Sequence, residues 1–248
     1  MKLIRKILIK ILGIEGYIKL ASRVYLKLVR HGFLKKQYPE LFYLKKIIKP
    51  GDVCIDIGAN LGYYSTLMSH LAGKNGKIYA VEPIPMFYNI WIKNVKQSGY
   101  KNLELFPYAL GGEQKTVKMG MPERDGLLHH GMTKVVSSAN ENYQKFFDVE
   151  MRMPDVLFAK IERLNFVKCD VEGYESEVFY NMKETLKRLK PMVQSELNGN
   201  ENRMKVITLF ESLGYTTKIL NEAHELRNVT SEEKLSLSQD FYFIPQKI

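Results

Sequence analysis

Two carboxylates and a glycine-containing turn are the first residues of this sequence whose types and spacing could do chemistry. Asp56 stands one residue before the end of the apolar run at 53–57, and Gly58 and Gly62 follow this run. Glu82 ends a second apolar run, 24 residues beyond Gly58. Open parallel sheets bind ligands at the carboxyl ends of their strands, where glycines allow close approach and a helix start offers free N–H groups. We therefore expect these residues to form one ligand site.

The spacing of these residues distinguishes between nucleotide ligands. A dinucleotide site has the pattern G-x-G-x-x-G, but Asn60 stands at the place of its second glycine, and no Gly-Lys-Ser/Thr of a phosphate-binding loop follows. An acid at the end of the second strand can accept hydrogen bonds from both ribose hydroxyls. A nucleoside without a diphosphate meets these conditions, and S-adenosylmethionine is such a molecule. The alternative is that both acids only cap their strands.

The parts of S-adenosylmethionine can be assigned to these residues. Asp56 suits its ammonium group, the turn 58–62 suits its methionine carboxylate, and Glu82 suits its ribose. The turn after the third expected strand, Pro107-Tyr108-Ala109, is placed to meet adenine. The complete set of expected cofactor-binding residues is Asp56, Gly58, Ala59, Asn60, Gly62, Tyr64, Ser65, Glu82, Tyr108, Ala109 and Asp170.

A second group of acids follows the apolar run at 165–169. Asp170 and Glu172 stand where this strand is expected to end, so one of them could orient or deprotonate an acceptor hydroxyl. Alternatively, both only hold the turn. His130 is a third candidate catalytic residue, because histidine titrates near neutral pH, although it could equally be a loop histidine in solvent. We expect the side chain of Lys168 to point to the opposite face of the strand and to support the fold.

Oxygen ligands for a metal also occur near this point. Asp170, Glu196 and Asn198 follow neighbouring expected strands and could together hold Mg²⁺, which prefers hard oxygen ligands. Side chains of these types at strand ends more often serve a turn or a cofactor. We therefore expect S-adenosylmethionine as the cofactor and no metal requirement.

The elements that must position these residues alternate along the chain. Residues 111–146 interrupt the alternation as an irregular insertion, with a short strand near 116–119. The alternation itself predicts an α/β fold with a doubly wound, mostly parallel sheet and a closing antiparallel pair. Strands are expected at 53–57, 77–83, 102–110, 165–173, 191–197, 215–220 and 240–245, a strand and short helix at 148–161, and helices at 62–72, 85–98, 174–189 and 200–214.

Several motifs, taken in order, resemble those of FkbM-type methyltransferases. FVKCDVEGYESEVF at 166–179 resembles the family signature Lys-Ile-Asp-Val-Glu-Gly-x-Glu. DIGANLGYYS, VEP, ALGG, MPDVL, PMVQSEL and DFYFIP match further segments, so the resemblance covers about residues 50 to 245. It implies a Rossmann-like class I methyltransferase fold with seven strands, the last of them antiparallel. It also implies S-adenosylmethionine as methyl donor and a hydroxyl acceptor on a sugar, polyketide or similar natural product.

The positive charge of the protein is concentrated at its N-terminus. Residues 1–36 hold ten Lys or Arg and one acid, whereas the remainder has a net charge of +1. Apolar residues recur at helical spacing there, but charges interrupt them well short of the ~20 residues that a membrane span needs. We divide the chain into a basic amphipathic helical arm at 1–40 and a methyltransferase domain at 41–248. The arm could lie on an anionic membrane surface or pack on the domain.

These observations predict an enzyme that methylates a hydroxyl of a saccharide, glycolipid or related metabolite. An RNA 2′-O-methyltransferase is a second interpretation, against which the nearly neutral domain argues. A non-catalytic, membrane-peripheral binding module is a third, against which the intact glycine turn and acids argue. We expect a small-molecule or glycan acceptor rather than nucleic acid. Buried free cysteines and the absence of a signal-peptide pattern favour the cytoplasm, where the arm could attach the protein to the inner face of the membrane.

Overall fold

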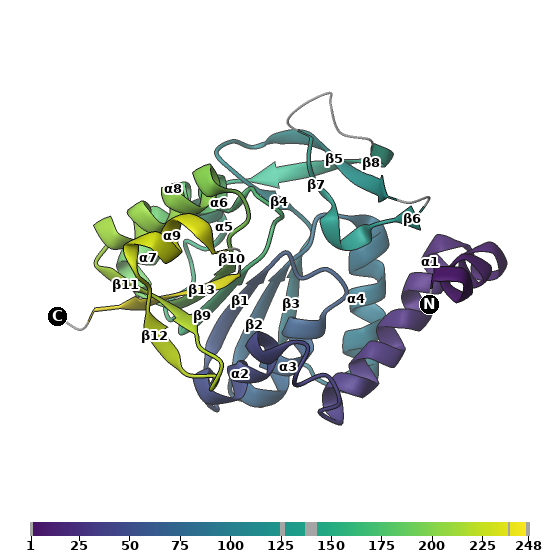
Figure 1. Cartoon of the computed structure of the whole chain (residues 1–248), viewed down its shortest axis with the longest axis horizontal. Helices are drawn as coiled ribbons and strands as arrows, with labels where there is room; N and C mark the ends of the chain where they lie inside the picture. Colours follow the sequence, from purple (N-terminus) through teal and green to yellow (C-terminus); the bar gives the residue numbers. More distant parts are fainter. Residues whose placement is uncertain (1, 125–126, 137–142, 238, 247–248) are drawn as a thin grey trace.

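A computed structural model describes residues 2–124, 127–136, 143–237 and 239–246 (Figure 1). Its centre is an eight-stranded sheet of order β12-β11-β13-β10-β9-β1-β2-β3. The strands are β1 (Val53–Ile57), β2 (Lys77–Val81), β3 (Leu103–Phe106), β9 (Phe166–Cys169), β10 (Met192–Glu196), β11 (Tyr215–Leu220), β12 (Leu226–Asn228) and β13 (Asp240–Pro245).

The topology of this sheet is that of class I methyltransferases. Strands β3, β2, β1, β9 and β10 are parallel, and β13 inserts antiparallel between β10 and β11. The expected fold class, with its antiparallel last strand, is confirmed. The strand number differs from the expected seven, because β12 pairs with β11 as an additional edge strand. Only three residues long, β12 is too short to show an alternating pattern in the sequence.

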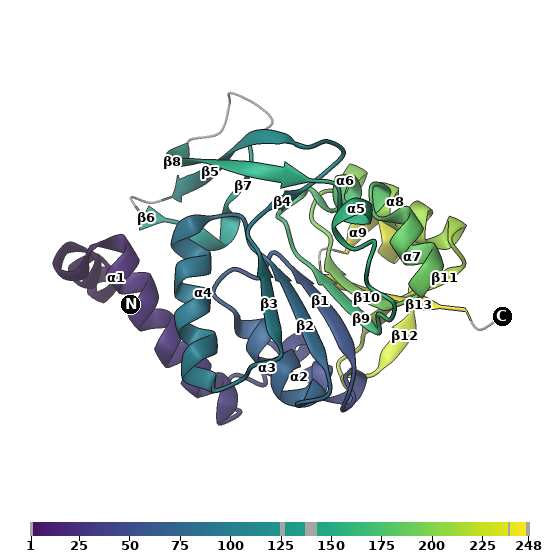
Figure 2. The ribbon, with the colours of Figure 1, turned by 180° about the vertical axis from the view of Figure 1, so that it is seen from behind.

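Helices cover both faces of the sheet (Figure 2). Side chains such as Ile55 and Val167 pack on one face under α6, α7 and α8. Cys54 and Phe166 pack on the other face, under α2 and α3. The helices are α2 (Pro39–Ile47), α3 (Tyr63–Ala72), α4 (Pro85–Ser98), α5 (Pro154–Leu157), α6 (Glu175–Tyr180), α7 (Lys183–Leu189), α8 (Asn200–Ser212) and α9 (Ser231–Ser236). As expected, Cys54 and Cys169 are buried free thiols.

The segment 111–146, expected to be irregular, instead builds most of a second sheet. Its long strand β5 pairs antiparallel with β8, and the short strands β4, β6 and β7 flank this pair. Alternate residues such as Met119, Met121 and Val149 are buried against α4, so tertiary packing stabilises strands that the polar composition conceals. The bounds are β4 (Ala109–Leu110), β5 (Lys115–Arg124), β6 (Leu127–Leu128), β7 (Lys134–Val135) and β8 (Tyr143–Arg152), with the 3₁₀ turn η1 (His130–Met132).

The N-terminal arm forms helix α1 (Lys2–Arg30), which kinks at Gly13 with φ 68°. Its second half packs on α4, where Ile18 is buried and the side-chain amide of Asn94 donates to Ser22 Oγ at 3.3 Å. Its first half leaves apolar side chains such as Ile7 and Ile11 exposed. Within the described residues, α1 and the other helices all fall short of the length and apolarity needed to cross a bilayer.

Candidate active site

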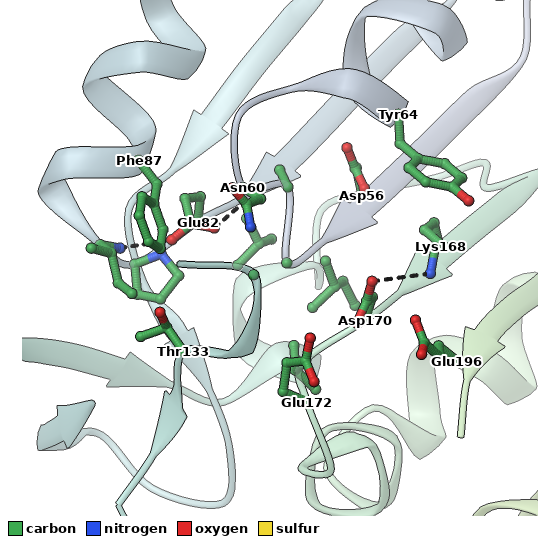
Figure 3. A pocket seen from close by; sticks show the side chains of 18 of the residues that line it. Asp56, Asn60, Tyr64, Glu82, Phe87, Thr133, Lys168, Asp170, Glu172 and Glu196 are labelled. Carbon is green, nitrogen blue, oxygen red and sulfur yellow. Dashed lines mark hydrogen bonds and ion pairs between the residues drawn. The ribbon is translucent and has the colours of Figure 1, made fainter. Parts of the chain in front are cut away.

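A cavity of about 410 Å³ opens at the carboxyl ends of β1, β2 and β9 (Figure 3). Residues Met119, Thr133 and Val135 of the second sheet and its neighbouring turn line it as well, so that sheet covers the site. The cavity brings together most residues that the sequence assigns to cofactor and catalysis: Asp56, Gly58, Ala59, Asn60, Tyr64, Glu82, Tyr108, Ala109, Asp170 and Glu172.

Asp56 is held at the end of β1 by a chain of hydrogen bonds. The indole N–H of Trp91 donates to Ser65 Oγ at 2.9 Å, and the Ser65 hydroxyl donates to Asp56 Oδ2. Asp56 is 1% exposed, and burial raises its pKa to about 6, against the opposing effect of the Ser65 hydrogen bond. Ser65, expected to contact cofactor, thus orients Asp56, and Trp91 in turn holds Ser65.

Glu82 joins the turns that follow β1 and β2. Its Oε2 accepts the backbone N–H of Asn60 at 2.8 Å, and its Oε1 accepts the backbone N–H of Ile84 at 2.9 Å. Burial raises the pKa of Glu82 to about 7, although these two hydrogen bonds oppose the shift. Each carboxylate oxygen keeps a second lone pair, so Glu82 can still accept hydrogen bonds from two hydroxyl groups of a ligand in the cavity.

The glycine turn is required by close packing as well as by its backbone angles. Gly58 has φ 78°, and a Cβ there would lie 1.9 Å from the carbonyl oxygen of Asp170. Gly62 has φ 88°, and a Cβ there would lie 2.8 Å from Cδ1 of Trp91. The turn after β1 therefore touches the residue after β9 directly, while Gly62 packs closely against the indole ring of Trp91.

The acids of the Asp-Val-Glu-Gly-x-Glu motif have different positions. Asp170 and Glu172 line the cavity, and Glu172 has a left-handed φ of 55°. Glu175, the first residue of α6, accepts the backbone N–H groups of Val171 at 3.0 Å and Gly173 at 3.2 Å. Glu175 thereby holds the loop that presents Glu172. The left-handed backbone of Glu172 is strained, and strain of this kind concentrates at functional sites.

Lys168 corrects the expectation that it faces away from the site. Residues two apart in a strand point to the same face, so Lys168 shares the face of Asp170. Its Nζ lies 3.6 Å from Asp170 Oδ2 (Figure 3). The same Nζ lies 3.5 Å from Asp240 Oδ1, and the Lys168 side chain is 3% exposed. Burial alone lowers the pKa of Lys168, but Asp240 and Asp170 outweigh this effect and raise the pKa. The alternation of the strand was the signal that could have identified it.

Further carboxylates line the cavity together with Asp170. Burial and neighbouring carboxylates raise the pKa of Glu172 to about 8. Burial raises the pKa of Glu40 to about 7, and burial together with Asp170 raises that of Glu196. Among the described lining residues, Lys168 supplies the cationic side chain, and the carboxylates belong to Glu40, Asp56, Glu82, Asp170, Glu172, Glu196 and Asp240.

Two further candidates are His130, expected to act in catalysis, and Asn198, expected with Asp170 and Glu196 as a possible metal ligand. His130 lies in η1, but its side chain is outside the described part of the structure. Asn198 donates from Nδ2 to Glu196 Oε1 at 3.2 Å, so its amide nitrogen faces this carboxylate. In the described ranges, no group of three or more His, Cys, Asp or Glu side chains is arranged to hold a metal ion.

Comparison with known proteins identifies the family of this chain. The family described as "Methyltransferase FkbM domain" matches residues 56–229. The chain belongs to this family. Its members are S-adenosylmethionine-dependent methyltransferases, as the motifs and the sheet topology of this FkbM-domain protein both indicate.

Solved structures and curated relatives show narrower similarities. A Clostridium thermocellum protein provisionally assigned as an rRNA methylase has a TM-score of 0.51 at 11% identity, covering 84% of this chain and 96% of its own. The FkbM methyltransferase of Methylobacillus flagellatus KT has a TM-score of 0.49 at 11% identity, covering 78% and 43%. Protein-L-isoaspartate O-methyltransferase of Methanosarcina mazei is 45% identical over 53 residues, which span 21% of this chain and 22% of that enzyme. The structural likeness shows the fold alone.

The residues of the cavity fit S-adenosylmethionine. Asn60 lines the cavity, and within the described residues nothing donates to its buried Oδ1, so this oxygen is an unused hydrogen-bond acceptor beside the site. Gly58 leaves the β1 turn free of a side chain where it meets β9. The ionised forms of Asp56 and Glu82 would complement a cationic, hydroxyl-bearing ligand, whereas a pyrophosphate would meet their charges unfavourably.

Proposed function

We propose that this FkbM-domain protein is an O-methyltransferase that transfers the methyl group of S-adenosylmethionine to a hydroxyl of a saccharide, glycolipid or related metabolite. The observation that carries the proposal is a single cavity lined by two pairs of carboxylates, Asp56 and Glu82 at the ends of β1 and β2, and Asp170 and Glu172 just after β9. The first pair suits the donor. The second pair suits an acceptor hydroxyl and its proton.

On the donor side, we assign Asp56 to the ammonium group and Glu82 to the ribose hydroxyls. We assign Asn60 Oδ1 as the acceptor of a further hydrogen bond from the cofactor. We assign Tyr108 and Ala109 as the residues that contact adenine. When bound, S-adenosylmethionine supplies an electrophilic methyl group on its sulfonium sulfur. The protein then has to hold the acceptor oxygen in line and remove one proton.

On the acceptor side, Glu172 is the proposed general base. Its raised pKa of about 8 makes the ionised carboxylate a stronger base than an ordinary glutamate. The proton of the acceptor hydroxyl passes to a carboxylate oxygen of Glu172, while Asp170 accepts a hydrogen bond that orients the acceptor. Lys168 compensates the charge of Asp170, and Glu175 holds the loop in place.

The charge of the cavity favours a neutral acceptor that carries many hydroxyls. Carboxylates such as Glu40, Glu196 and Asp240 can accept hydrogen bonds from a polyol. The same carboxylates repel a phosphodiester or a carboxylate, since like charges in a buried site are costly. A saccharide therefore suits this cavity better than the RNA backbone or the carboxyl group of a protein isoaspartate.

The arm provides the proposed link to the membrane. The exposed Ile7 and Ile11 lie in a segment whose net charge is +9, the combination of a helix that lies in an anionic interface. We expect the protein to float with phosphatidylglycerol vesicles and not with phosphatidylcholine vesicles. The double variant Ile7→Gln/Ile11→Gln should lose flotation, and Val156→Gln, at an exposed apolar position on α5, should keep it. Equal flotation of both variants would contradict the membrane role.

The methylation proposal is tested in two stages. Calorimetry should first show binding of S-adenosylmethionine, and absence of binding at millimolar ligand would refute the proposal. Labelled donor is then supplied with purified RNA, with soluble saccharides and with a lipid extract of cell envelopes. Label in either of the last two fractions, sensitive to Glu172→Gln, supports the assignment. Label confined to RNA would replace it with the RNA alternative.

A further inference from the structure

An apolar groove of about 360 Å³ runs along the arm, outside the catalytic cavity. One wall is the second half of α1, and the other is the segment 34–38 that leads into α2. Aliphatic and aromatic side chains dominate its lining: Leu8, Tyr17, Leu20, Ala21, Val24, Tyr25, Leu28, Leu34, Gln37 and Tyr38. Its size is within the range of small-molecule sites.

The groove shares a wall with the catalytic cavity. Tyr25 and Tyr38 line both hollows. Their rings meet edge to face with centroids 5.5 Å apart, and Tyr25 also contacts Tyr63, a lining residue of the cavity, at 4.2 Å. A layer of aromatic rings thus separates an apolar hollow from a hollow rich in carboxylates.

The rim of the groove is open and apolar, and its surroundings are basic. Leu20 is 42% exposed and Val24 is 50% exposed, so apolar edges of the groove face solvent. Phe33, in the turn after α1, is 75% exposed. The surrounding segment, residues 1–36, carries a net charge of +9. An anionic lipid surface complements both the apolar rim and the positive charge around it, whereas a small polar ligand without charge complements neither.

We propose that this groove holds the hydrocarbon chain of a lipid-linked acceptor, whose hydroxyl-bearing head enters the catalytic cavity. The inference rests on the proposed function and narrows its acceptor class to amphiphiles. The two adjoining hollows match the two halves of such a molecule in polarity. The aromatic wall of Tyr25 and Tyr38 then lies at the junction of chain and head, a place that amphipathic aromatic rings occupy at membrane interfaces.

Alkyl glucosides below their micelle concentrations are suitable probes, because the head stays constant while the chain lengthens. Methyl, hexyl, octyl and decyl glucoside are titrated into the full chain saturated with S-adenosylmethionine. Each methylene that enters an apolar site increases affinity by up to roughly fourfold. We expect at least a tenfold gain from hexyl to decyl glucoside, and a parallel fall in KM if the glucosides are methylated.

Three variants separate binding in the groove from nonspecific hydrophobic adsorption. Ala21→Phe places a ring in the groove and should abolish the gain with chain length, while affinity for S-adenosylmethionine stays unchanged and shows that the variant is folded. Val156→Phe adds the same ring on the exposed face of α5 and should keep the gain. Leu20→Gln, on the open rim, should reduce the gain without filling the groove.

The outcomes distinguish this inference from the proposed function. Chain-length dependence in wild type and Val156→Phe, lost in Ala21→Phe, supports the groove. Equal affinity for all glucosides, or the same gain in Ala21→Phe as in wild type, overturns it even when saccharide methylation is observed. Failure to bind S-adenosylmethionine would instead overturn the proposed function, whatever the glucosides do.

Discussion

Replacement of Glu82 by glutamine tests the donor side of the cavity most directly. Glu82 accepts backbone N–H groups from Asn60 and Ile84, one on each carboxylate oxygen. A glutamine amide can keep one of these bonds but turns its NH₂ group toward the other N–H. The unpaired backbone donor destabilises the fold by about 1–3 kcal/mol in free and bound protein alike, whereas a ribose hydroxyl that loses its charged acceptor weakens binding by about 1.5–3 kcal/mol. We expect affinity for S-adenosylmethionine to fall roughly 10- to 100-fold.

The pH dependence of binding gives a second and sharper readout. Burial raises the pKa of Glu82 to about 7 in the unliganded protein. Ribose hydroxyls bind the ionised form, so affinity should rise with pH through 7 and then level off. A single group with this pKa is about one-tenth ionised at pH 6 and about nine-tenths ionised at pH 8. Its ionisation should therefore contribute a roughly tenfold increase in affinity for S-adenosylmethionine between these two pH values. Glu82→Gln should lose this share.

Isothermal titration calorimetry at pH 6, 7 and 8 measures both quantities. Glu104→Gln is the matched control, because Glu104 is an exposed acid on the neighbouring strand β3 and pairs with Lys77 at 2.8 Å. The control should bind like wild type, since exposed ion pairs contribute little. Unchanged affinity and unchanged pH dependence in Glu82→Gln would refute the assignment of Glu82 to the ribose.

Four further outcomes are expected. Gly58→Ala should reduce the free energy of unfolding by about 2–5 kcal/mol in urea titrations, because its Cβ meets the Asp170 carbonyl, whereas Gly99→Ala, with φ 77° and open space, should cost only about 1–2 kcal/mol. Glu172→Gln should lower kcat about 10²- to 10⁴-fold and remove its rise through pH 8, as pH–rate profiles would show. Lys168→Met should destabilise the fold by about 3–5 kcal/mol in the same titrations, because the mostly buried Asp240 loses its cation and the partly exposed Asp170 loses it as well. Carboxyl groups whose pKa burial raises bind protons more tightly when folded, so the Tm of the unliganded protein should fall from pH 5 to pH 8; a Tm that rises over this range would contradict those shifts.

The parts of the fold predicted from sequence are those with a local signal. Strand β1 and helix α4 have the expected bounds. An apolar run that ends before Gly58 marks β1, and Pro85 at the start and Gly99 after the end mark α4. Asp56 and Glu82 were identified for a similar reason. Both stand at the end of a parallel strand, and such ends meet at one edge of the sheet.

The parts that were missed depend on contacts distant in sequence. The second sheet exists because β5 meets β8 about 30 residues later and packs on α4, and neither contact is visible in a polar, Gly-rich segment. The clamping role of Glu175 depends on the loop that folds back on it. Lys168 differs, because the alternation of strand β9 already carried the answer and the facing was assigned wrongly.

The register of the sheet explains why Lys168 belongs to the site. Asp56, Lys168, Gln194 and Tyr242 occupy equivalent positions on the four neighbouring strands β1, β9, β10 and β13, and all four are buried. One row earlier, the same face carries Cys54 and Phe166, which belong to the apolar core. The polar row is therefore the boundary at which the sheet stops being core and becomes the floor of the cavity.

A buried row of this kind needs internal charge balance, because burying an unpaired charge costs several kcal/mol. Lys168 supplies the balance for Asp170 and Asp240, while Ser65 and Trp91 hold Asp56 from the other end. Gly58 then presses the donor turn against the backbone of Asp170. Donor and acceptor sides are thus joined by one row of side chains and one backbone contact, so a change at Gly58 should alter methyl transfer as well as cofactor affinity.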